Sequence, residues 1–230
     1  NCLSYDPAFS YEVAVIIKDG IQKMYVDQKN YFYYITTTNE NYQHPQMPED
    51  SEDGIIRGMY KLIEADKPVI RLLGSGSILR ESINARDILQ KYKISAEVWS
   101  VTSFNLLRKD GMETERYNQL NPNSKEKKSY VGTCFESNPI PVIASTDYMR
   151  SYAEQIRPYI DEDFTVLGTD GFGRSDSREM LREFFEIDAN SIVRASAYTL
   201  YKNGNLNKDI LDKIYKDIGV DSTKINPWEA

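Results

Sequence analysis

The chain has 230 residues, of which 40% are hydrophobic, so it can bury a sizeable core in one large domain or in one domain plus part of another. Its formal net charge is −7, and its Lys and Arg residues do not cluster into the basic stripe that a nucleic-acid interface needs. We therefore expect no nucleic-acid partner.

Cysteine usage and hydropathy restrict where the protein can work. Cys2 and Cys134 lie far apart and outside any CxxC spacing, so neither a disulfide framework nor a zinc site is indicated, and a reducing cytoplasm fits best. Apolar runs such as Val13 to Ile17 are too short to cross a bilayer, and the N-terminus lacks the pattern of a signal peptide. We expect a soluble, cytoplasmic protein with no membrane partner.

The N-terminal part of the chain is predicted to hold one helix, one strand and a linker. Asp6 followed by Pro7 is a good helix start, and apolar residues at helical spacing extend the helix from about Pro7 to Tyr25. The aromatic run within Tyr31 to Thr37 predicts a buried strand. The segment Asn41 to Asp53 is proline-bearing and acidic, as interdomain linkers are. Because one helix and one strand cannot make a domain, residues 1–46 are interpreted as the end of a domain whose body precedes them.

Residues 47–230 show a regular alternation of strand and helix patterns, which predicts one α/β domain. The strands are expected at Val69 to Leu73, Ala96 to Val101, Pro141 to Ala144 and Thr165 to Gly168, and the helices at Ile78 to Tyr92, Asn105 to Leu120, Asp147 to Ile156 and Asp176 to Phe185. A segment from Ser191 to Lys202 and a capped helix from Asn207 to Ile218 follow. The alternation predicts right-handed crossovers and a mostly parallel sheet with helices on both faces.

Two strand-to-helix junctions are rich in glycine, as phosphate-binding loops are. The first, "LLGSGSILRES" from Leu72 to Ser82, has Leu79 where a dinucleotide fingerprint needs its third glycine. The second, "LGTDGFGRSDSRE" from Leu167 to Glu179, spaces its glycines as GxxGxG and lacks the Lys-Ser/Thr of a P-loop. Neither junction matches a nucleotide-binding motif.

The acidic residues of the second junction argue against direct anion binding. Asp170 and Asp176 would repel an anion at the helix start, and Asp176 with Glu179 three residues on is better explained as an N-cap. Direct ligand contact stays an alternative, because crevices at such sheet edges do bind ligands. Arg174 and Arg178 could pair with Asp170 or with another carboxylate, or could present a guanidinium to an anionic substrate.

Few other residues offer chemistry. His44 is the only histidine and lies in the predicted linker, so a solvated side chain is favoured over a general base or metal ligand, and no Ser/His/Asp or Cys/His arrangement can be built. Asn39 and Glu40 leave the carboxyl end of the aromatic strand, where α/β sheets place functional polar groups. For Glu40, a functional role and a linker-anchoring role are equally supported.

Eight collinear blocks carry a resemblance that covers essentially the whole chain. They are "NCLSYDPAFSYEVAVIIKDG", "YYITTTNENYQHPQMPE", "GMYKL", "LLGSGSILRE", "VWSVTSFNLLRKDG", "ASTDYMRSYAEQIRPY", "VLGTDGFGRSDSREMLREFFEIDA" and "KINPWEA". In these blocks the sequence resembles the C-terminal part of the homodimeric bacterial type of pyruvate dehydrogenase decarboxylating component. That family consists of thiamine diphosphate enzymes of the transketolase-like superfamily.

The resemblance implies a division of the chain and a set of cofactors. Residues 1–46 would be the end of the pyrimidine-binding domain plus linker, and residues 47–230 the transketolase-like C-terminal domain. In this family a GDG…NN motif holds thiamine diphosphate and Mg²⁺, and a glutamate activates the pyrimidine ring; both lie upstream of this chain. We therefore expect no catalytic, cofactor-binding or metal-binding residue here, and no cofactor bound by this chain alone.

The resemblance also implies an activity and partners for the complete subunit. That subunit would decarboxylate pyruvate and reductively acetylate the lipoyl groups of the dihydrolipoyl acetyltransferase, and would act as a homodimer. The alternatives are a non-catalytic dimerisation or complex-docking domain, and transketolase-type carbon transfer. For Arg174 and Arg178 the resemblance favours pairing with Asp170 or with a carboxylate across the dimer interface, because pyruvate in this family would be held close to a cofactor carried by other domains. The residues that could lie near substrate or at an interface are Asp6, Asn39, Glu40, Asp170, Arg174, Asp176 and Arg178.

Overall fold

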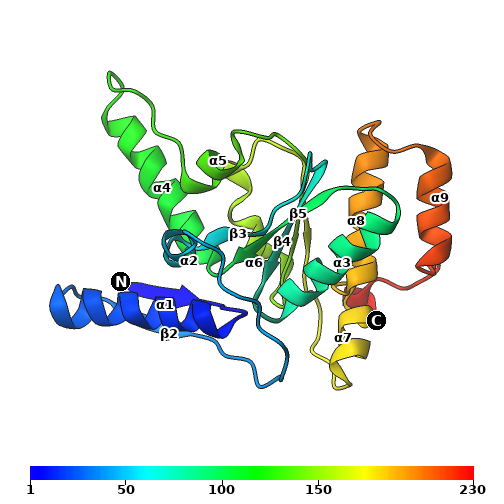
Figure 1. Cartoon of the computed structure of the whole chain (residues 1–230), viewed down its shortest axis with the longest axis horizontal. Coiled ribbons are helices and arrows are strands. Elements are labelled where there is room, and N and C mark those ends of the chain that lie inside the picture. Colours follow the sequence, from blue (N-terminus) through cyan, green and yellow to red (C-terminus); the bar gives the residue numbers. More distant parts are fainter.

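Two sheets of different size organise the chain (Figure 1). The structure is a computed structural model that describes every residue from 1 to 230. The smaller sheet pairs β1 (Cys2–Tyr5) with β2 (Phe32–Ile35) in parallel. The larger sheet has the order β3-β5-β4-β6-β7 and consists of β3 (Met59–Ile63), β4 (Ile70–Ser75), β5 (Ala96–Val101), β6 (Val142–Ser145) and β7 (Phe164–Leu167). Within it only the edge strand β3 runs antiparallel, so the predicted α/β fold with a mostly parallel sheet is confirmed.

Helices cover both faces of the larger sheet. One cluster of 21 buried residues includes side chains of α3 (Leu79–Lys91), α8 (Ala189–Lys202) and α9 (Lys208–Asp217). A second cluster of 15 residues includes side chains of α4 (Phe104–Leu120), α5 (Tyr130–Phe135) and α6 (Arg150–Glu154). Leu72 belongs to the first cluster and Leu73 to the second, because successive strand side chains point to opposite faces. None of the helices combines the length and apolar composition that a membrane crossing requires.

The N-terminal elements pack beside this domain. α1 (Ser10–Ile21) continues as a π-helical turn, and its buried face joins β1, α2 (Glu52–Arg57) and β3 in a third cluster of six residues. Ala8 and Phe9 reach further and belong to the largest cluster of the C-terminal domain. Residues 36–51 contain no helix or strand and run between the two parts.

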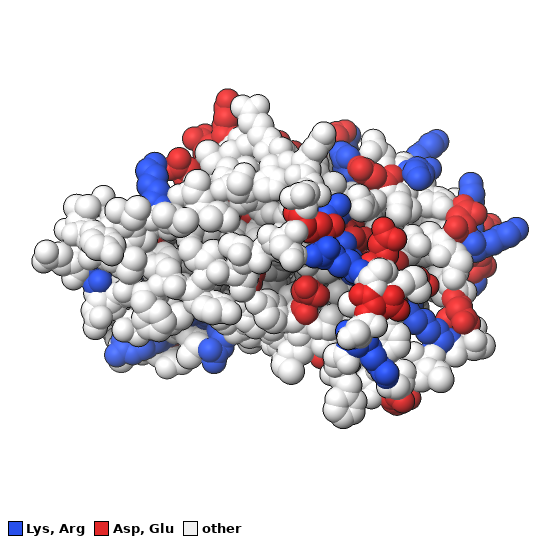
Figure 2. Space-filling view, turned by 90° about the horizontal axis from the view of Figure 1, so that it is seen from below, with Lys and Arg blue, Asp and Glu red and all other residues white.

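The N-terminal elements expose many apolar side chains. Figure 2 shows few charged side chains over these elements, whereas acidic and basic side chains are interspersed over the C-terminal domain. The exposed apolar residues there are Ile17, Ile21, Tyr25, Val26, Phe32 and Tyr34. The prediction of a buried aromatic strand is therefore wrong, since Phe32 is 54% and Tyr34 61% exposed. β2 has only one neighbouring strand, and the side chains of its second face, Phe32 and Tyr34, are more than half exposed.

Several predicted boundaries also differ from the structure. The first helix begins at Ser10 and not at Pro7, because β1 and the turn after it occupy the preceding residues. The last two residues of the predicted linker belong to α2, and neither β3 nor α5 was predicted. The elements α2, β3 and α5 are each only five or six residues long, which is too short for a clear periodic pattern. α7 (Arg178–Phe184) begins two residues later than predicted, and 3₁₀ turns lie at Gly76–Ile78, Arg157–Tyr159 and Pro227–Glu229.

Candidate functional site

The strand order creates a crevice at the carboxyl ends of β4 and β6. The chain passes from β4 through α3 to β5 on one side of β4, whereas β6 pairs with β4 on its other side. When the connections after two adjacent parallel strands go to opposite faces of the sheet, a gap forms between them at the carboxyl ends of the strands. Open α/β sheets bind ligands in such gaps. The residues that follow the two strands are Gly76 and Ser77 after β4, and Thr146 and Asp147 after β6.

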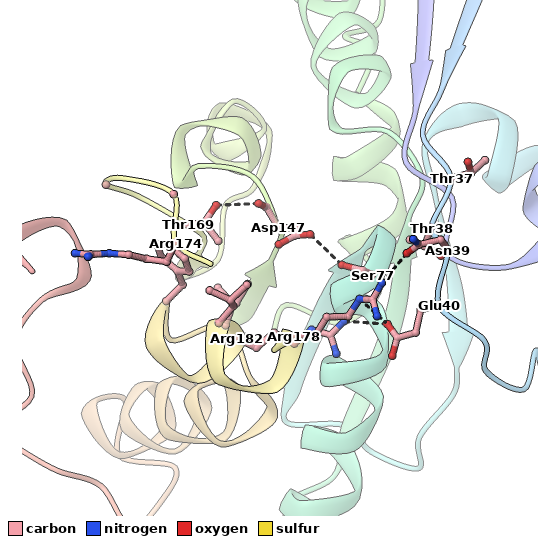
Figure 3. A pocket seen from close by; sticks show the side chains of 15 residues that line it. Thr37, Thr38, Asn39, Glu40, Ser77, Asp147, Thr169, Arg174, Arg178 and Arg182 are labelled. Carbon is pink, nitrogen blue, oxygen red and sulfur yellow. Dashed lines mark hydrogen bonds and ion pairs between the residues drawn. The ribbon is translucent and has the colours of Figure 1, made fainter. Parts of the chain in front are cut away.

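Two adjoining cavities lie at this edge of the sheet. The smaller, about 240 Å³, is lined by both strand ends and by residues of the N-terminal part, among them Asp6 and Ser75. The larger, about 650 Å³, extends over α7 and the linker (Figure 3). They share Thr37, Thr38, Ser77 and Asp147, and we call the two together the edge cleft. Ser77 Oγ donates a hydrogen bond of 3.1 Å to Asp147 Oδ2 across it.

Glu40 ties the linker to two helices at the rim of the cleft. Its carboxylate oxygens lie 2.6 Å from Arg80 Nη1, 3.3 Å from Arg182 Nη2 and 3.9 Å from Arg178 Nε. Arg182 in turn binds Glu81 at 3.0 Å. Partial burial pushes the pKa of Glu40 upward, but Arg80 and Arg182 outweigh it and hold the pKa below its ordinary value. The structure thus gives Glu40 linker-anchoring contacts.

The two candidate arginines of the second glycine loop are placed differently. Arg178 points toward Glu40 in Figure 3, and its Nη2 donates a 2.6 Å hydrogen bond to Asn39 Oδ1. Arg174 points away from this cluster; its Nη2 donates to the Ala230 carbonyl, and it forms no salt bridge with Asp or Glu. Pairing with a carboxylate of the same chain therefore holds for Arg178 and not for Arg174.

Asp170 and Asp176 do not take the roles that the sequence predicted. Asp170 pairs with neither Arg174 nor Arg178, because Arg150 is nearer: its Nε lies 3.3 Å from Asp170 Oδ2. The N-cap of α7 is Ser177, whose Oγ accepts a hydrogen bond from Met180 N, while Asp176 only accepts one from Ser177 N. The prediction of Asp176 as N-cap is wrong because Glu179 three residues on imitates a capping box one residue too early.

Asp6 joins the N-terminal part to the C-terminal domain. Its side chain is buried and accepts three hydroxyl hydrogen bonds, from Thr36 at 2.8 Å, Tyr148 at 2.8 Å and Tyr152 at 2.9 Å. Burial raises the pKa of Tyr148 and of Tyr152, and the Asp6 carboxylate raises each pKa further, so both phenol hydroxyls stay donors. Asp6 is therefore an internal interface residue.

Sequence reasoning missed a second buried carboxylate at this internal interface. Glu12 of α1 is fully buried, and its oxygens accept hydrogen bonds from the backbone of Ala8 and Phe9, from Tyr60 OH at 2.7 Å and from Ser100 Oγ at 2.6 Å. Burial raises its pKa, and these donors only partly oppose the rise. The signal in the sequence was a single acid inside the apolar run "SYEVAVII".

A buried ion pair in the larger sheet was also missed. Arg71 of β4 is 2% exposed, and its Nε lies 2.5 Å from Glu97 Oε1 on β5. The Arg71 guanidinium also stacks 3.9 Å from the centre of the Phe135 ring. Charged residues in a fully buried strand pattern were the available signal.

Neither a metal centre nor a histidine-based site is assembled in this chain. No group of three or more His, Cys, Asp or Glu side chains is placed to hold a metal ion. His44 is exposed, and its Nδ1 accepts a hydrogen bond from Ser10 N at 2.9 Å, so it holds the linker against the start of α1.

The architecture is that of the transketolases. A transketolase from Pichia stipitis superposes with a TM-score of 0.62 at 18% identity, covering 90% of this chain and 26% of that one. A transketolase from Leishmania mexicana gives 0.61 at 19% identity, covering 88% of this chain and 26% of that one. At these identities the likeness shows the fold alone.

Sequence comparison defines the family. The model of the transketolase-like TK C-terminal domain matches residues 58–188, and that of the pyruvate dehydrogenase E1 component middle domain matches residues 1–45. The chain belongs to the transketolase-like C-terminal domain family.

Curated relatives confirm the resemblance to pyruvate dehydrogenase E1 components. The chain is 49% identical to that of Pseudomonas aeruginosa over 100% of its own length and 27% of the relative. It is 50% identical to that of Escherichia coli K12 over 99% of its own length and 26% of the relative. The chain thus spans about a quarter of these relatives and matches a C-terminal part of them.

Proposed function

We propose that this chain is the C-terminal part of a subunit that decarboxylates pyruvate and reductively acetylates lipoyl groups. The observation that carries the proposal is its 49% identity to a pyruvate dehydrogenase E1 component along its whole length. On this reading the complete subunit is a cytoplasmic homodimer, and its partner is the dihydrolipoyl acetyltransferase of the pyruvate dehydrogenase complex. The domain boundary between residues 46 and 47 is part of the same proposal.

The complete subunit would use thiamine diphosphate with Mg²⁺, and the residues of this chain do not fit that group. Bound thiamine diphosphate supplies the carbanion chemistry that side chains cannot. Mg²⁺ bound through carboxylates and phosphates requires clustered oxygen ligands, and this chain provides no acidic cluster for a metal ion. We therefore expect the cofactor to be held by segments outside this chain, and this chain alone to be inactive.

The contribution of this chain would be positional. Asp6 and Glu12 fix the N-terminal elements on the C-terminal domain, and Glu40 fixes the linker between them. Each carboxylate makes at least two close polar contacts, so the relative orientation of the two parts is strongly specified. A rigid connection of this kind would hold the middle-domain end steady beside the cofactor-binding segments of the complete subunit.

The test compares the longer protein that contains this chain with the chain by itself. Pyruvate-dependent reduction of ferricyanide is measured with thiamine diphosphate and Mg²⁺, and xylulose 5-phosphate replaces pyruvate in a parallel assay. We expect activity with pyruvate in the longer protein only. Carbon transfer from the sugar phosphate, with none from pyruvate, would sink the proposal.

The alternative is a non-catalytic dimerisation or docking domain. It predicts that the longer protein is inactive with both substrates, while this chain still self-associates or binds the acetyltransferase. Analytical ultracentrifugation of this chain, alone and with the acetyltransferase, distinguishes the two readings when it is combined with the activity assay.

A further inference from the structure

We propose that the edge cleft binds a small phosphomonoester that carries neighbouring hydroxyl groups, the chemistry shared by ribose 5-phosphate and a ribonucleotide. The cleft lies where the order of the sheet reverses, between the carboxyl ends of β4 and β6. Its two cavities, about 240 and 650 Å³, together have the size of a site for a small metabolite.

The inner end of the cleft is built to bind hydroxyl groups. Ser75 is 3% exposed and lines the smaller cavity, and its Oγ has no hydrogen-bond partner in the protein. A buried hydroxyl without a partner costs free energy, so a ligand oxygen or a water at this point is favourable. Gly76 follows with φ of +52°, and no atom lies within 3.7 Å of where its Cβ would be, so the backbone leaves open space here.

Asp147 supplies a hydroxyl acceptor next to this end. It is exposed, its Oδ2 accepts a hydrogen bond from Ser77, and its Oδ1 accepts none from the protein. A carboxylate oxygen accepts hydrogen bonds from a sugar diol and repels a phosphate. Together with Asp6 it therefore excludes the phosphate from the inner end.

The outer end of the cleft offers positive charge for that phosphate. Arg174, Arg178 and Arg182 line the larger cavity, against the carboxylates of Glu40 and Asp147. Arg182 is satisfied by Glu40 and Glu81, but Arg178 is 55% exposed, its Nε is 3.9 Å from Glu40, and its Nη1 makes no hydrogen bond. Arg178 can therefore donate to a phosphate oxygen without breaking the pair that anchors the linker.

The inner and outer ends of the edge cleft share lining residues, so one ligand can contact both ends. Thr37, Thr38, Ser77 and Asp147 line both cavities. In Figure 3 the Ser77 and Asp147 side chains lie between the second glycine loop and the linker. The assignment is thus phosphate on Arg178 and hydroxyl groups on Asp147 and Ser77, with the unpaired hydroxyl of Ser75 behind them in the wall of the inner end.

The experiment titrates this chain with ribose 5-phosphate, AMP and inorganic phosphate, and follows binding by calorimetry and by amide chemical shifts. We expect both phosphomonoesters to bind at least tenfold more tightly than inorganic phosphate, with shift changes at Gly76, Ser77 and Arg178. If AMP binds more tightly than ribose 5-phosphate, the phosphomonoester that the cleft recognises is that of a nucleotide. If AMP binds equally or more weakly, it is that of a sugar phosphate.

Variants separate the two ends. Arg178→Gln should weaken both phosphomonoesters at least tenfold, and Asp147→Asn should abolish the preference for ribose 5-phosphate over inorganic phosphate. Arg116→Gln, on the exposed surface of α4, is the matched control and should change nothing. Absence of binding, equal affinity for inorganic phosphate, or equal weakening by Arg116→Gln would each overturn the proposal.

Discussion

Glu12 of α1 accepts a 2.7 Å hydrogen bond from Tyr60 of β3, although they are 48 positions apart in the chain. Glu12 belongs to the segment matched by the middle-domain model, and Tyr60 to the segment matched by the C-terminal domain model. This contact therefore joins two family domains through a buried acid that has no cationic partner. Such a group links the packing of the two parts to pH.

The first prediction concerns the pH dependence of stability. Burial raises the folded-state pKa of Glu12 above its unfolded value. Between these two pKa values the folded state keeps the Glu12 proton, whereas the unfolded state has released it. Its contribution to the free energy of unfolding is complete below the unfolded pKa and is lost as the pH rises through the raised folded pKa. Glu12→Gln, which keeps the shape and most hydrogen bonds, should remove this loss. Urea unfolding of both proteins between pH 4.5 and 8 measures the difference.

The facing titratable groups do not obscure this test. Tyr11 and Tyr60 pack against Glu12, and burial raises the pKa of each phenol, so both stay neutral across that range. Glu12→Ala, by contrast, leaves buried donors unpaired and should cost about 1–3 kcal/mol at pH 4.5, with the cost shrinking as the pH rises and the parent loses the contribution of Glu12. Parallel pH profiles for the parent chain and Glu12→Gln would contradict the raised pKa.

A second prediction tests the corrected cap of α7. Ser177→Ala removes the oxygen that accepts from Met180 N and should lower the free energy of unfolding by about 0.5–2 kcal/mol. Asp176→Ala should cost less, because Asp176 accepts only from the adjacent Ser177 N. Thermal and urea unfolding of the two variants gives the comparison. A larger loss for Asp176→Ala would restore Asp176 as the functional cap.

The outcome for α7 illustrates what the sequence could predict about this fold. Long periodic segments such as α4, and the buried strand β5, were predicted within a residue or two because many residues carry their pattern. The N-cap was misplaced because Asp176 and Ser177 are adjacent and both are capping residues. β3 was missed because five residues at a sheet edge, with only partial burial, leave too short a pattern.

Contacts between residues far apart in the sequence were harder to predict than the helices and strands. Glu40 and Arg178 were candidates because they lie at strand ends or loop positions, which a linear pattern shows. Their partners were not predictable, since Arg80 and Arg182 approach Glu40 from two different helices. The same applies to Ser75, whose buried and unpaired hydroxyl is a property of packing alone.

A third prediction concerns the exposed face of β2 that carries Phe32 and Tyr34. Phe32 and Tyr34 are more than half exposed on β2, so this chain should self-associate through that face. Phe32→Lys with Tyr34→Lys should shift the weight-average mass in sedimentation toward the monomer. Tyr198→Lys is the matched control, because Tyr198 is an exposed aromatic residue on α8. An equal effect of the control would argue against the proposed face.

The last prediction asks whether Glu40 anchors the linker or serves the edge cleft. Its folded-state pKa is lowered by Arg80 and Arg182, so its contribution to stability is present above the unfolded pKa and lost as the pH falls through the folded pKa. Glu40→Gln should therefore cost about 1–3 kcal/mol at pH 7, and the difference from the parent should shrink as the pH falls below 4.5. Chemical denaturation across that range measures it.

The control for this experiment is Glu113→Gln. Glu113 pairs with Lys109 at 3.9 Å on the exposed surface of α4, where an ion pair contributes little, so its removal should change stability by less than about 1 kcal/mol. Anchoring predicts a loss of stability for Glu40→Gln together with retained, or tighter, binding of ribose 5-phosphate, because Arg178 is freed from its carboxylate neighbour. Unchanged stability with clearly weakened binding would instead make Glu40 a ligand contact of the cleft.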